Sequence, residues 1–318
     1  MLIINEKDIA AVFDANEIIA AIEKAYSLQD EHSTLIPDRA HINYGMNTLL
    51  LMPGFTNHVM GTKLVSVFPE NRAKGKPVIY GQMMLNDLET GEPLALINGN
   101  KLTAVRTGGV GATAIKHLAP NVNTLGIIGA GVQGFHQLLL SIKVKPFRKI
   151  IVFDNNAKQA EKTAVEIKQH YPEIEVSVCG VANELVTQSD VIITATTSAK
   201  PVFDVNTQLL NGKLFVGIGS YKPEMTELPP EVMAAANTIF VDTPHAMDES
   251  GDLVIPLKKN IIKKEKIVPF RKLLTSQVKK SSGINVFKSV GMALFDLTVA
   301  DYLYRKCLTQ GMGTEIEF

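Results

Sequence analysis

Glycines at fixed spacing, followed by an acid, form the strongest chemical signal in the sequence. The pattern Gly129-x-Gly131-x-x-Gly134 comes directly after the apolar run Leu125–Ile128, and a second apolar run ends at Asp154. In a strand–turn–helix unit, the first glycine allows the tight turn, the second lets backbone amides approach a pyrophosphate, and the third lets the helix pack on the sheet. The helix N-terminus then offers unpaired N–H groups to the phosphates. A purely structural glycine turn is the other interpretation, but strand, helix and terminal acid in register favour a dinucleotide site.

Asp154 also bears on which dinucleotide would bind. A carboxylate at this place accepts hydrogen bonds from the ribose diol of NAD and repels the 2′-phosphate of NADP. Asn155 and Asn156 stand where an arginine would accommodate that phosphate, although Lys158 lies nearby. The sequence therefore predicts NAD as the cofactor, with NADP possible.

Three cations in the first part of the chain have unusual neighbours. Arg39 follows Pro37 and Asp38 at the start of a predicted strand, Lys63 lies inside an apolar strand, and Arg106 lies among small residues of a predicted helix. A cation in such surroundings cannot stay buried without a partner. An internal salt bridge or a side chain that reaches solvent is the commoner explanation for a lone strand lysine. Alternatively, the three cations clamp a substrate carboxylate, the arginines as planar forks and Lys63 as a movable donor.

The second half of the chain alternates strand and helix patterns. We expect helices at 132–143, 157–170 and 181–188, and strands at 125–128, 149–154, 175–178, 190–195, 213–218 and 237–241. Strands separated by helical patterns of this length predict a parallel, doubly wound α/β sheet of the Rossmann type. The glycine pattern is thus embedded in the architecture that uses it.

The first part of the chain predicts a different domain. A helix with Asp14 as its N-cap is expected to run to Leu28, and short strands follow at 39–44, 48–52, 59–65, 78–86 and 93–97. Turn residues between these strands favour a largely antiparallel sheet in an α+β domain. Helices are expected at 101–117 and 286–305. We therefore expect an α+β domain of residues 1–120 and 290–318, and a dinucleotide-binding domain of residues 121–289.

Composition excludes several classes of function. The chain has 318 residues, 46% of them hydrophobic and 20% charged, and its formal net charge is zero, so nothing favours binding to nucleic acid or to an anionic membrane. The N-terminus lacks a signal-peptide pattern, and no apolar run approaches the roughly 18 residues that span a bilayer. The cysteines and histidines show no metal-ligand spacing. We expect a cytoplasmic protein without a metal site.

Several ordered stretches resemble the ornithine cyclodeaminase/μ-crystallin family over nearly the whole chain. They are Leu51-Met-Pro53, Gly61-Thr-Lys63, Pro69-Glu-Asn71, Ala104-Val-Arg-Thr-Gly108, Gly129-Ala-Gly-Val-Gln133, Thr194-Ala-Thr-Thr197, Glu249-Ser-Gly-Asp252 and Lys288-Ser-Val-Gly291. The resemblance implies a homodimer whose substrate domains join through their β-sheets. It also implies that Arg39, Lys63 and Arg106 hold an amino or imino acid carboxylate beside a nicotinamide. The residues that it implies for cofactor binding are Thr107, Gly129, Gly131, Val132, Gln133, Asp154, Thr196, Thr197 and Val290.

Two departures from the family pattern bear on the reaction. Ornithine cyclodeaminases of the family carry a glutamate where this chain has Leu50, and a leucine cannot hydrogen-bond the side-chain ammonium of ornithine. Cyclodeaminases and the family's alanine dehydrogenase also place a catalytic aspartate where Tyr221 stands, and no aspartate lies between Gly217 and Leu228. The pattern is therefore closer to the branch that reduces cyclic imines, the ketimine or Δ1-pyrroline-2-carboxylate reductases, and to μ-crystallin.

These residues predict hydride transfer between a nicotinamide and the C=N or C=O carbon beside a carboxylate. Arg39 and Arg106 would fix the carboxylate of a small imino or amino acid such as Δ1-pyrroline-2-carboxylate. Lys63 would be a second carboxylate donor and the leading candidate for proton relay, because two neighbouring arginines should lower its pKa. The alternatives are a cyclodeaminase-type lyase that uses catalytic NAD and a μ-crystallin-like cofactor-binding protein with little turnover.

Overall fold

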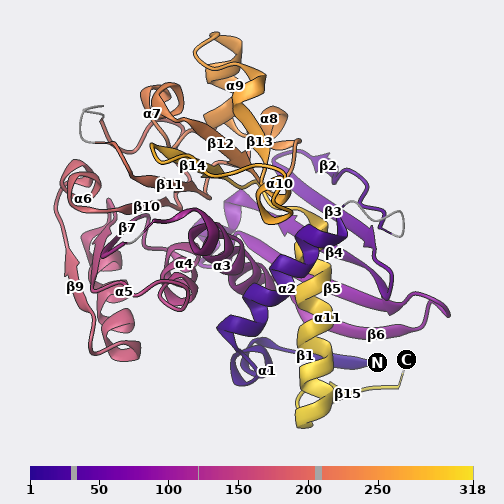
Figure 1. Ribbon diagram of the computed structural model, residues 1–318. Helices are drawn as coiled ribbons and strands as arrows, with labels where there is room; N and C mark the ends of the chain where they lie inside the picture. Colours follow the sequence, from indigo (N-terminus) through magenta and orange to yellow (C-terminus); the bar gives the residue numbers. More distant parts are fainter. Residues whose placement is uncertain (30–33, 121, 205–209, 318) are drawn as a thin grey trace. The chain divides into compact units, whose positions relative to one another are not determined.

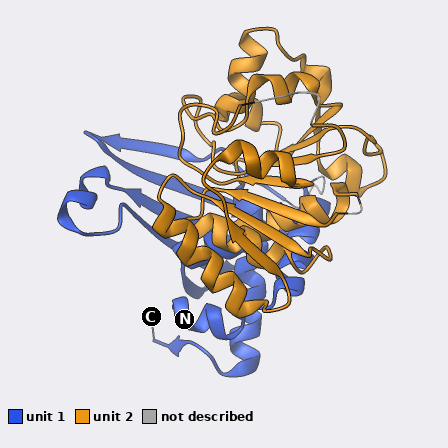
Figure 2. Cartoon of the chain, turned by 90° about the vertical axis from the view of Figure 1, so that its left-hand side faces the viewer, with its two compact units in different colours: residues 1–106, 292–318 blue, residues 107–291 orange. Residues whose placement is uncertain are grey.

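The chain divides into two compact units, which Figure 2 shows in different colours. The computed structural model describes residues 1–29, 34–120, 122–204 and 210–317. Unit 1 comprises Met1–Arg106 and Met292–Phe318, and unit 2 comprises Thr107–Gly291. The first division falls inside helix α3 (Gly99–Leu118), not at residue 120. The second half of α3 packs within unit 2, where the Thr107 carbonyl accepts a hydrogen bond from Gln137 and the His117 ring meets Phe270 edge-on.

Unit 2 is built on an eight-stranded sheet in which every neighbouring pair is parallel (Figure 1). The strand order is β13-β12-β14-β11-β10-β7-β8-β9. The strands are β7 (Thr124–Ile128), β8 (Lys149–Phe153), β9 (Glu175–Val178), β10 (Val191–Thr194), β11 (Leu214–Gly217), β12 (Thr238–Val241), β13 (Ile267–Pro269) and β14 (Asn285–Lys288). The chain reverses direction across the sheet between β7 and β10, the place at which Rossmann-type sheets bind ligands. The predicted fold class is confirmed.

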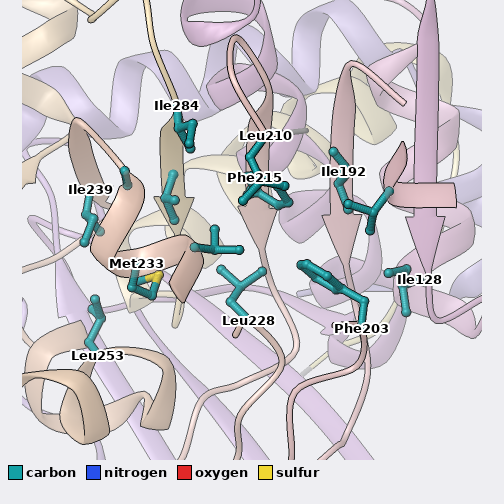
Figure 3. Close-up of a cluster of buried hydrophobic side chains, with 14 of the residues drawn as sticks. Ile128, Ile192, Phe203, Leu210, Phe215, Leu228, Met233, Ile239, Leu253 and Ile284 are labelled. Carbon is teal, nitrogen blue, oxygen red and sulfur yellow. The ribbon is translucent and has the colours of Figure 1, made fainter. Parts of the chain in front are cut away.

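Helices connect these strands, and apolar side chains fill the space between helices and sheet. The helical elements are α4 (Val132–Ser141), α5 (Ala157–His170), α6 (Ala182–Gln188), α7 (Pro230–Ala235), α8 (Ala246–Glu249), α9 (Gly251–Lys258), η3 (Lys264–Lys266) and α10 (Arg271–Leu274). Figure 3 shows part of the core, in which Ile192 of β10 and Phe215 of β11 lie in one buried cluster with Met233 of α7. Burial of this apolar surface is the main term that holds the helices on the sheet.

The predicted start of the C-terminal helix was wrong. The sequence indicated a helix over 286–305, but residues 285–288 form strand β14 between β11 and β12, and the helix α11 is Ala293–Gln310. The cause is that Val286 and Phe287 belong to a fully buried strand, and a short apolar run has no period that separates such a strand from a buried helix.

Unit 1 contains a seven-stranded sheet of order β15-β1-β6-β5-β4-β3-β2. Its strands are β1 (Leu2–Ile4), β2 (Ala40–Tyr44), β3 (Asn47–Phe55), β4 (Val59–Val67), β5 (Ile79–Asp87), β6 (Pro93–Asn98) and β15 (Thr314–Glu315). The pair β1–β6 is parallel and the other pairs are antiparallel. The predicted largely antiparallel sheet is confirmed. The short strands β1 and β15 were not predicted, because two or three residues carry no readable alternation.

The other elements of unit 1 are α1 (Glu6–Ala11), α2 (Ala15–Leu28), η1 (Pro69–Lys74), the part of α3 up to Arg106, and α11. Asp14 caps α2 as predicted, because its Oδ1 accepts the N–H groups of Asn16 and Glu17 at 2.8 and 3.1 Å. Helices α2 and α11 pack together through an edge-on pair of rings, Tyr26 and Phe295, with centroids 5.1 Å apart. Within the described residues, no helix combines the length and apolar character needed to cross a bilayer.

Candidate active site

A buried cluster of charge in unit 1 joins two of the three cations that the sequence singled out. The Lys63 ammonium lies 2.8 Å from both carboxylate oxygens of Asp296, and Arg106 Nε donates to Asp296 Oδ1 at 3.0 Å. Lys63 also donates to the Thr103 hydroxyl at 3.4 Å. All three charged residues are nearly inaccessible to solvent, with Asp296 fully buried. One carboxylate from α11 therefore binds a cation from β4 and another from α3.

A pair of glycines explains how Asp296 comes so close to the sheet. Gly54 and Gly61 face each other across β3 and β4. A Cβ atom on Gly54 would lie 2.6 Å from Leu297 Cδ1, and one on Gly61 would lie 3.2 Å from Leu297 Cδ2. Without those side chains, α11 approaches the strands at the residue next to Asp296. Lys63 lies two positions after Gly61 and so faces the same side of β4.

The electrostatics of this cluster set the proton state of Lys63. The pKa of Lys63 is lowered to about 8: burial is the largest cause, the charges of Arg106 and Arg39 add to the lowering, and Asp296 opposes it. For the Asp296 carboxyl, burial acts to raise the pKa, but Arg106 and Lys63 outweigh it and the net pKa is lowered. The predicted lowering of the Lys63 pKa is confirmed, with desolvation as its largest cause. Asp296 stays ionised at neutral pH.

The cluster contains the internal salt bridge that was the commoner explanation for such cations. A single carboxylate nevertheless serves two of them, so Lys63, Arg106 and Asp296 together carry one surplus positive charge when all are ionised. Arg39, half-buried ahead of β2, adds to this field at Lys63. Among the described residues, the terminal nitrogens of Arg106 make no hydrogen bond, since its contact with Asp296 uses Nε. The terminal nitrogens of a guanidinium form a planar fork that can pair with a carboxylate. That Arg106 binds a substrate in this way stays a prediction.

Sequence reasoning missed Asp296. Its partner Lys63 is 233 positions away along the chain, so no local spacing connects them. One signal was present: Asp296 is the only acid in the otherwise uncharged run 289–300. A lone acid in a predicted buried helix needs a cation as partner.

The glycine loop of unit 2 has the geometry that its sequence predicts. Gly129 has φ +99°, in the region that favours glycine, and a Cβ there would lie 2.6 Å from the Ala195 carbonyl oxygen. A Cβ on Gly134 would collide with the Gly129 carbonyl, whereas one on Gly131 would meet open space. Helix α4 follows Gly131 and has no side-chain cap. Its first N–H groups are therefore placed as the N–H groups of a phosphate-binding helix are.

Both backbone groups of Ala130 in this loop are held by side chains, from α5 and from the residue that follows β8. The Ala130 N–H donates to Asp154 Oδ2 at 2.8 Å, and the Ala130 carbonyl accepts from Gln159 Nε2 at 2.7 Å and from Thr163 Oγ1 at 2.8 Å. Asp154 Oδ1 accepts the Asn156 N–H at 2.8 Å. Each carboxylate oxygen keeps a second lone pair for a ribose hydroxyl. Asp154 thus fixes the loop and remains able to accept from a ribose.

The other residues implied for cofactor binding lie in unit 2 with mixed surroundings. The Thr107 hydroxyl and Gln133 Oε1 are buried and have no hydrogen-bond partner within the described part of the chain. Val132 and Thr197 are exposed, Thr196 is half-buried and Val290 is buried. The unpartnered Thr107 hydroxyl, the uncapped α4 and the open space at Gly131 together fit a dinucleotide phosphate. Their roles in binding stay predictions.

The two positions that depart from the family pattern lie in different units. Leu50 is in β3, paired with His41 on one side and Val65 on the other. Tyr221, in unit 2, is 40% exposed, and its ring centroid lies 5.9 Å from the Lys222 ammonium. Neither position supplies a carboxylate to a substrate amine.

We expect that replacing Asp154 by serine will weaken NADH binding by about 10- to 100-fold, because a charged hydrogen-bond acceptor is worth roughly 1.5–3 kcal/mol. The preference for NADH over NADPH should fall in the same variant, since the repulsion of a 2′-phosphate is lost. Dissociation constants from calorimetry test both points. Glu161→Gln, which removes an exposed acid from α5, is the matched control and should change neither constant. An unaltered preference in Asp154→Ser would refute this role.

Comparison with known proteins agrees with the fold. A profile of the ornithine cyclodeaminase/mu-crystallin family matches residues 3–311. A curated Δ1-pyrroline-2-carboxylate reductase of Bacillus thuringiensis subsp. konkukian is 36% identical over the full length of both chains. The solved Δ1-pyrroline-2-carboxylate reductase of Thermococcus litoralis, in complex with NADH and L-proline, is 32% identical with a TM-score of 0.93, covering 99% of this chain and all of that one. An archaeal alanine dehydrogenase dimer with bound NAD is 28% identical with a TM-score of 0.92, covering all of this chain and 99% of that one. The chain belongs to the ornithine cyclodeaminase/μ-crystallin family.

Proposed function

We propose that the protein is an NAD-dependent reductase of small cyclic imino acids such as Δ1-pyrroline-2-carboxylate. The observation that carries the proposal is the buried cluster of Lys63, Arg106 and Asp296, whose surplus positive charge suits a substrate carboxylate. The similarity to Δ1-pyrroline-2-carboxylate reductases, one of them solved with NADH and L-proline, supports the substrate class. The absence of an acid at Leu50 and Tyr221 counts against a cyclodeaminase.

In this reaction a bound nicotinamide supplies the hydride, and the chain's own residues position the acceptor and handle the proton. Arg106 offers its terminal nitrogens to the substrate carboxylate while Asp296 holds its Nε, so the guanidinium cannot rotate freely. Arg39 adds positive charge, and Lys63 is a second donor to the carboxylate. With a pKa of about 8, Lys63 Nζ holds a transferable proton near neutral pH, and reduction of C=N needs one proton at nitrogen.

A direct assay separates this proposal from its alternatives. The purified protein is incubated with NADH and a panel of cyclic imino acids and of α-keto acids with amines, and separately with ornithine and NAD. NADH consumption with cyclic imino acids supports the reductase. Ammonia and proline formed from ornithine without net change in NADH would instead establish a lyase. Cofactor binding without turnover of any substrate would point to a μ-crystallin-like binding protein.

We further propose that the protein is a homodimer joined through the unit 1 sheet. The edge strand β2 is exposed along its whole length, and large apolar side chains on and next to it face solvent, namely Ile42 (50% exposed), Tyr44 (86%) and Met46 (71%). Monomers rarely leave such an edge and such a patch uncovered. Light scattering should give twice the chain mass of 34.7 kDa, and Tyr44→Lys should shift the protein toward monomer. A wild-type protein that is monomeric at micromolar concentration would refute the dimer.

A further inference from the structure

Unit 2 contains a second buried cluster of charge that the proposed reaction does not use. Glu227, Asp252 and Lys288 are all fully buried. Lys288 ends β14, and its ammonium donates to the Gly217 carbonyl at 3.1 Å and lies 3.5 Å from Asp252 Oδ2. Asp252 Oδ1 accepts the N–H groups of Glu227 and Leu228 at 2.8 and 3.0 Å. Buried charges are costly, so three of them in one place call for a reason beyond stability.

Glu227 joins the loops that follow two neighbouring strands. One carboxylate oxygen accepts the Thr196 N–H, just after β10, at 2.5 Å. The other accepts the N–H groups of Gly219 and Ser220, just after β11, at 2.6 and 3.0 Å. Both oxygens act as acceptors only, which is the behaviour of an ionised carboxylate. Glu227 therefore ties these two loops to each other.

The place of these loops in the sheet indicates which part of the cofactor they face. In a doubly wound sheet the dinucleotide lies across the carboxyl ends of the strands, with one mononucleotide on each side of the first strand. Asp154 follows β8 and marks the adenosine side. Strands β10 and β11 lie on the other side of β7, which is the nicotinamide side.

The charges of the cluster do not cancel when all three groups are ionised. Two carboxylates and one ammonium leave a net charge of −1 in the interior of unit 2, where solvent screens weakly. Burial raises the pKa of the Glu227 carboxyl, as does the charge of Asp252, whereas Lys288 lowers it. Alkaline buffer therefore favours the ionised form. The oxidised nicotinamide ring carries a positive charge and the reduced ring carries none. A fixed negative charge therefore stabilises the oxidised ring relative to the reduced one.

We propose that the buried Glu227–Asp252–Lys288 cluster makes the cofactor site favour the oxidised nicotinamide over the reduced one. Glu227 thereby acts as a positioning residue for the β10 and β11 loops and as a source of the charge that makes bound NADH a stronger hydride donor. This inference rests on the proposed function and deepens it. Its consequence is a ratio of affinities for the two cofactor forms, which can be measured without turnover.

Asp252→Asn is the variant that removes one charge while keeping the backbone contacts of the cluster. Asp252 Oδ2 makes no hydrogen bond among the described residues and lies 3.5 Å from the Lys288 ammonium, so the substitution ends this ion pair while Oδ1 keeps both backbone N–H groups. Glu227→Gln is the second variant. In Glu227→Gln the amide nitrogen must face backbone N–H donors on one side, so this variant will bind both dinucleotides more weakly. Only the loss of charge changes the ratio of the two dissociation constants.

The experiment measures dissociation constants for NAD⁺ and NADH by calorimetry at pH 8.5 on the intact protein. We expect the ratio Kd(NAD⁺)/Kd(NADH) to rise on the order of tenfold in both variants, because a unit negative charge in the protein interior no longer acts on the positively charged oxidised ring. Glu224→Gln removes an exposed acid from the same connection and should leave the ratio unchanged, because solvent screens that charge.

The outcomes are distinct. A ratio that stays at the wild-type value in both variants, while both dinucleotides still bind, overturns the inference and leaves Glu227 a purely structural role. A wild-type protein that binds neither dinucleotide refutes the proposed function itself. Circular dichroism identifies a variant that fails to fold, and Asp252→Asn keeps the test valid if Glu227→Gln does so.

Discussion

Replacing Arg106 by lysine is expected to lower kcat/KM for the imino acid by about 10²–10⁴-fold, although the positive charge is kept. A lysine cannot reproduce the planar fork, and two charge-assisted hydrogen bonds at roughly 1.5–3 kcal/mol each are lost. The Nε contact with Asp296 is lost as well, so the side chain is no longer held in one orientation. Steady-state kinetics with saturating NADH measures the effect.

The control for Arg106→Lys is Arg72→Lys, which makes the same change at an exposed position of unit 1 and should leave kcat/KM unaltered. The dissociation constant for NADH should stay close to the wild-type value in Arg106→Lys, because the glycine loop and Asp154 are intact. If kcat/KM of Arg106→Lys equals the wild-type value, Arg106 only neutralises Asp296 and does not bind the substrate carboxylate as a fork.

Replacing Asp296 by asparagine is expected to change both the pH profile and the stability. In the wild type, Lys63 is protonated below its pKa of about 8, so turnover should be constant below that pH and fall as the pH rises through it. Asp296 raises the Lys63 pKa, so its loss should move this fall to lower pH. The thermal midpoint should drop by roughly 10 °C, since breaking a buried ion pair costs about 3–5 kcal/mol.

The sign of the stability effect follows from the lowered pKa of Asp296. A group whose pKa is lower in the folded state stabilises the protein above its unfolded pKa, and the stabilisation is lost as the pH falls through the folded pKa. The contribution of Asp296 is therefore complete at neutral pH, where the midpoints are compared. Lys63→Arg is the matched variant: its guanidinium neither titrates near pH 8 nor releases a proton, so turnover should be low and the alkaline fall should vanish. If turnover of Asp296→Asn falls at the same alkaline pH as turnover of the wild type, the protonation of Lys63 does not control the rate.

The presence of Asp296 explains how the site tolerates two buried cations before substrate arrives. Without it, Lys63 and Arg106 would repel each other in a medium of low dielectric constant. With it, one charge is matched and one remains for the substrate. A neutral site would bind a carboxylate weakly, and two unmatched cations would destabilise the fold.

Most of the unit 2 fold could be predicted because its signals are local. The glycine pattern, the β-branched runs and helix 157–170 all lie within a few tens of residues, and the structure has α5 at those residues. The failures have physical causes. Strand β14 is too short and too buried to show a period, and β1 and β15 are shorter still.

The candidate site was predicted in part for a similar reason. Lys63 and Arg106 could be found because a cation among apolar or small residues is anomalous by itself. The partners of Lys63 and of Lys288, namely Asp296 and Asp252, could not be assigned because the pairs form only through tertiary packing. The same holds for Glu227, whose three N–H donors lie in loops that follow different strands.

The most direct test of hydride transfer to an imino acid uses NADH that carries deuterium at both C4 positions, with Δ1-pyrroline-2-carboxylate as acceptor. Mass spectrometry of the product should find one deuterium on the carbon bonded to the carboxylate, because Arg106 and Lys63 fix that end of the substrate. NADH oxidation without deuterium in the product, or no oxidation with any carboxylate-bearing imine, would contradict the proposed function.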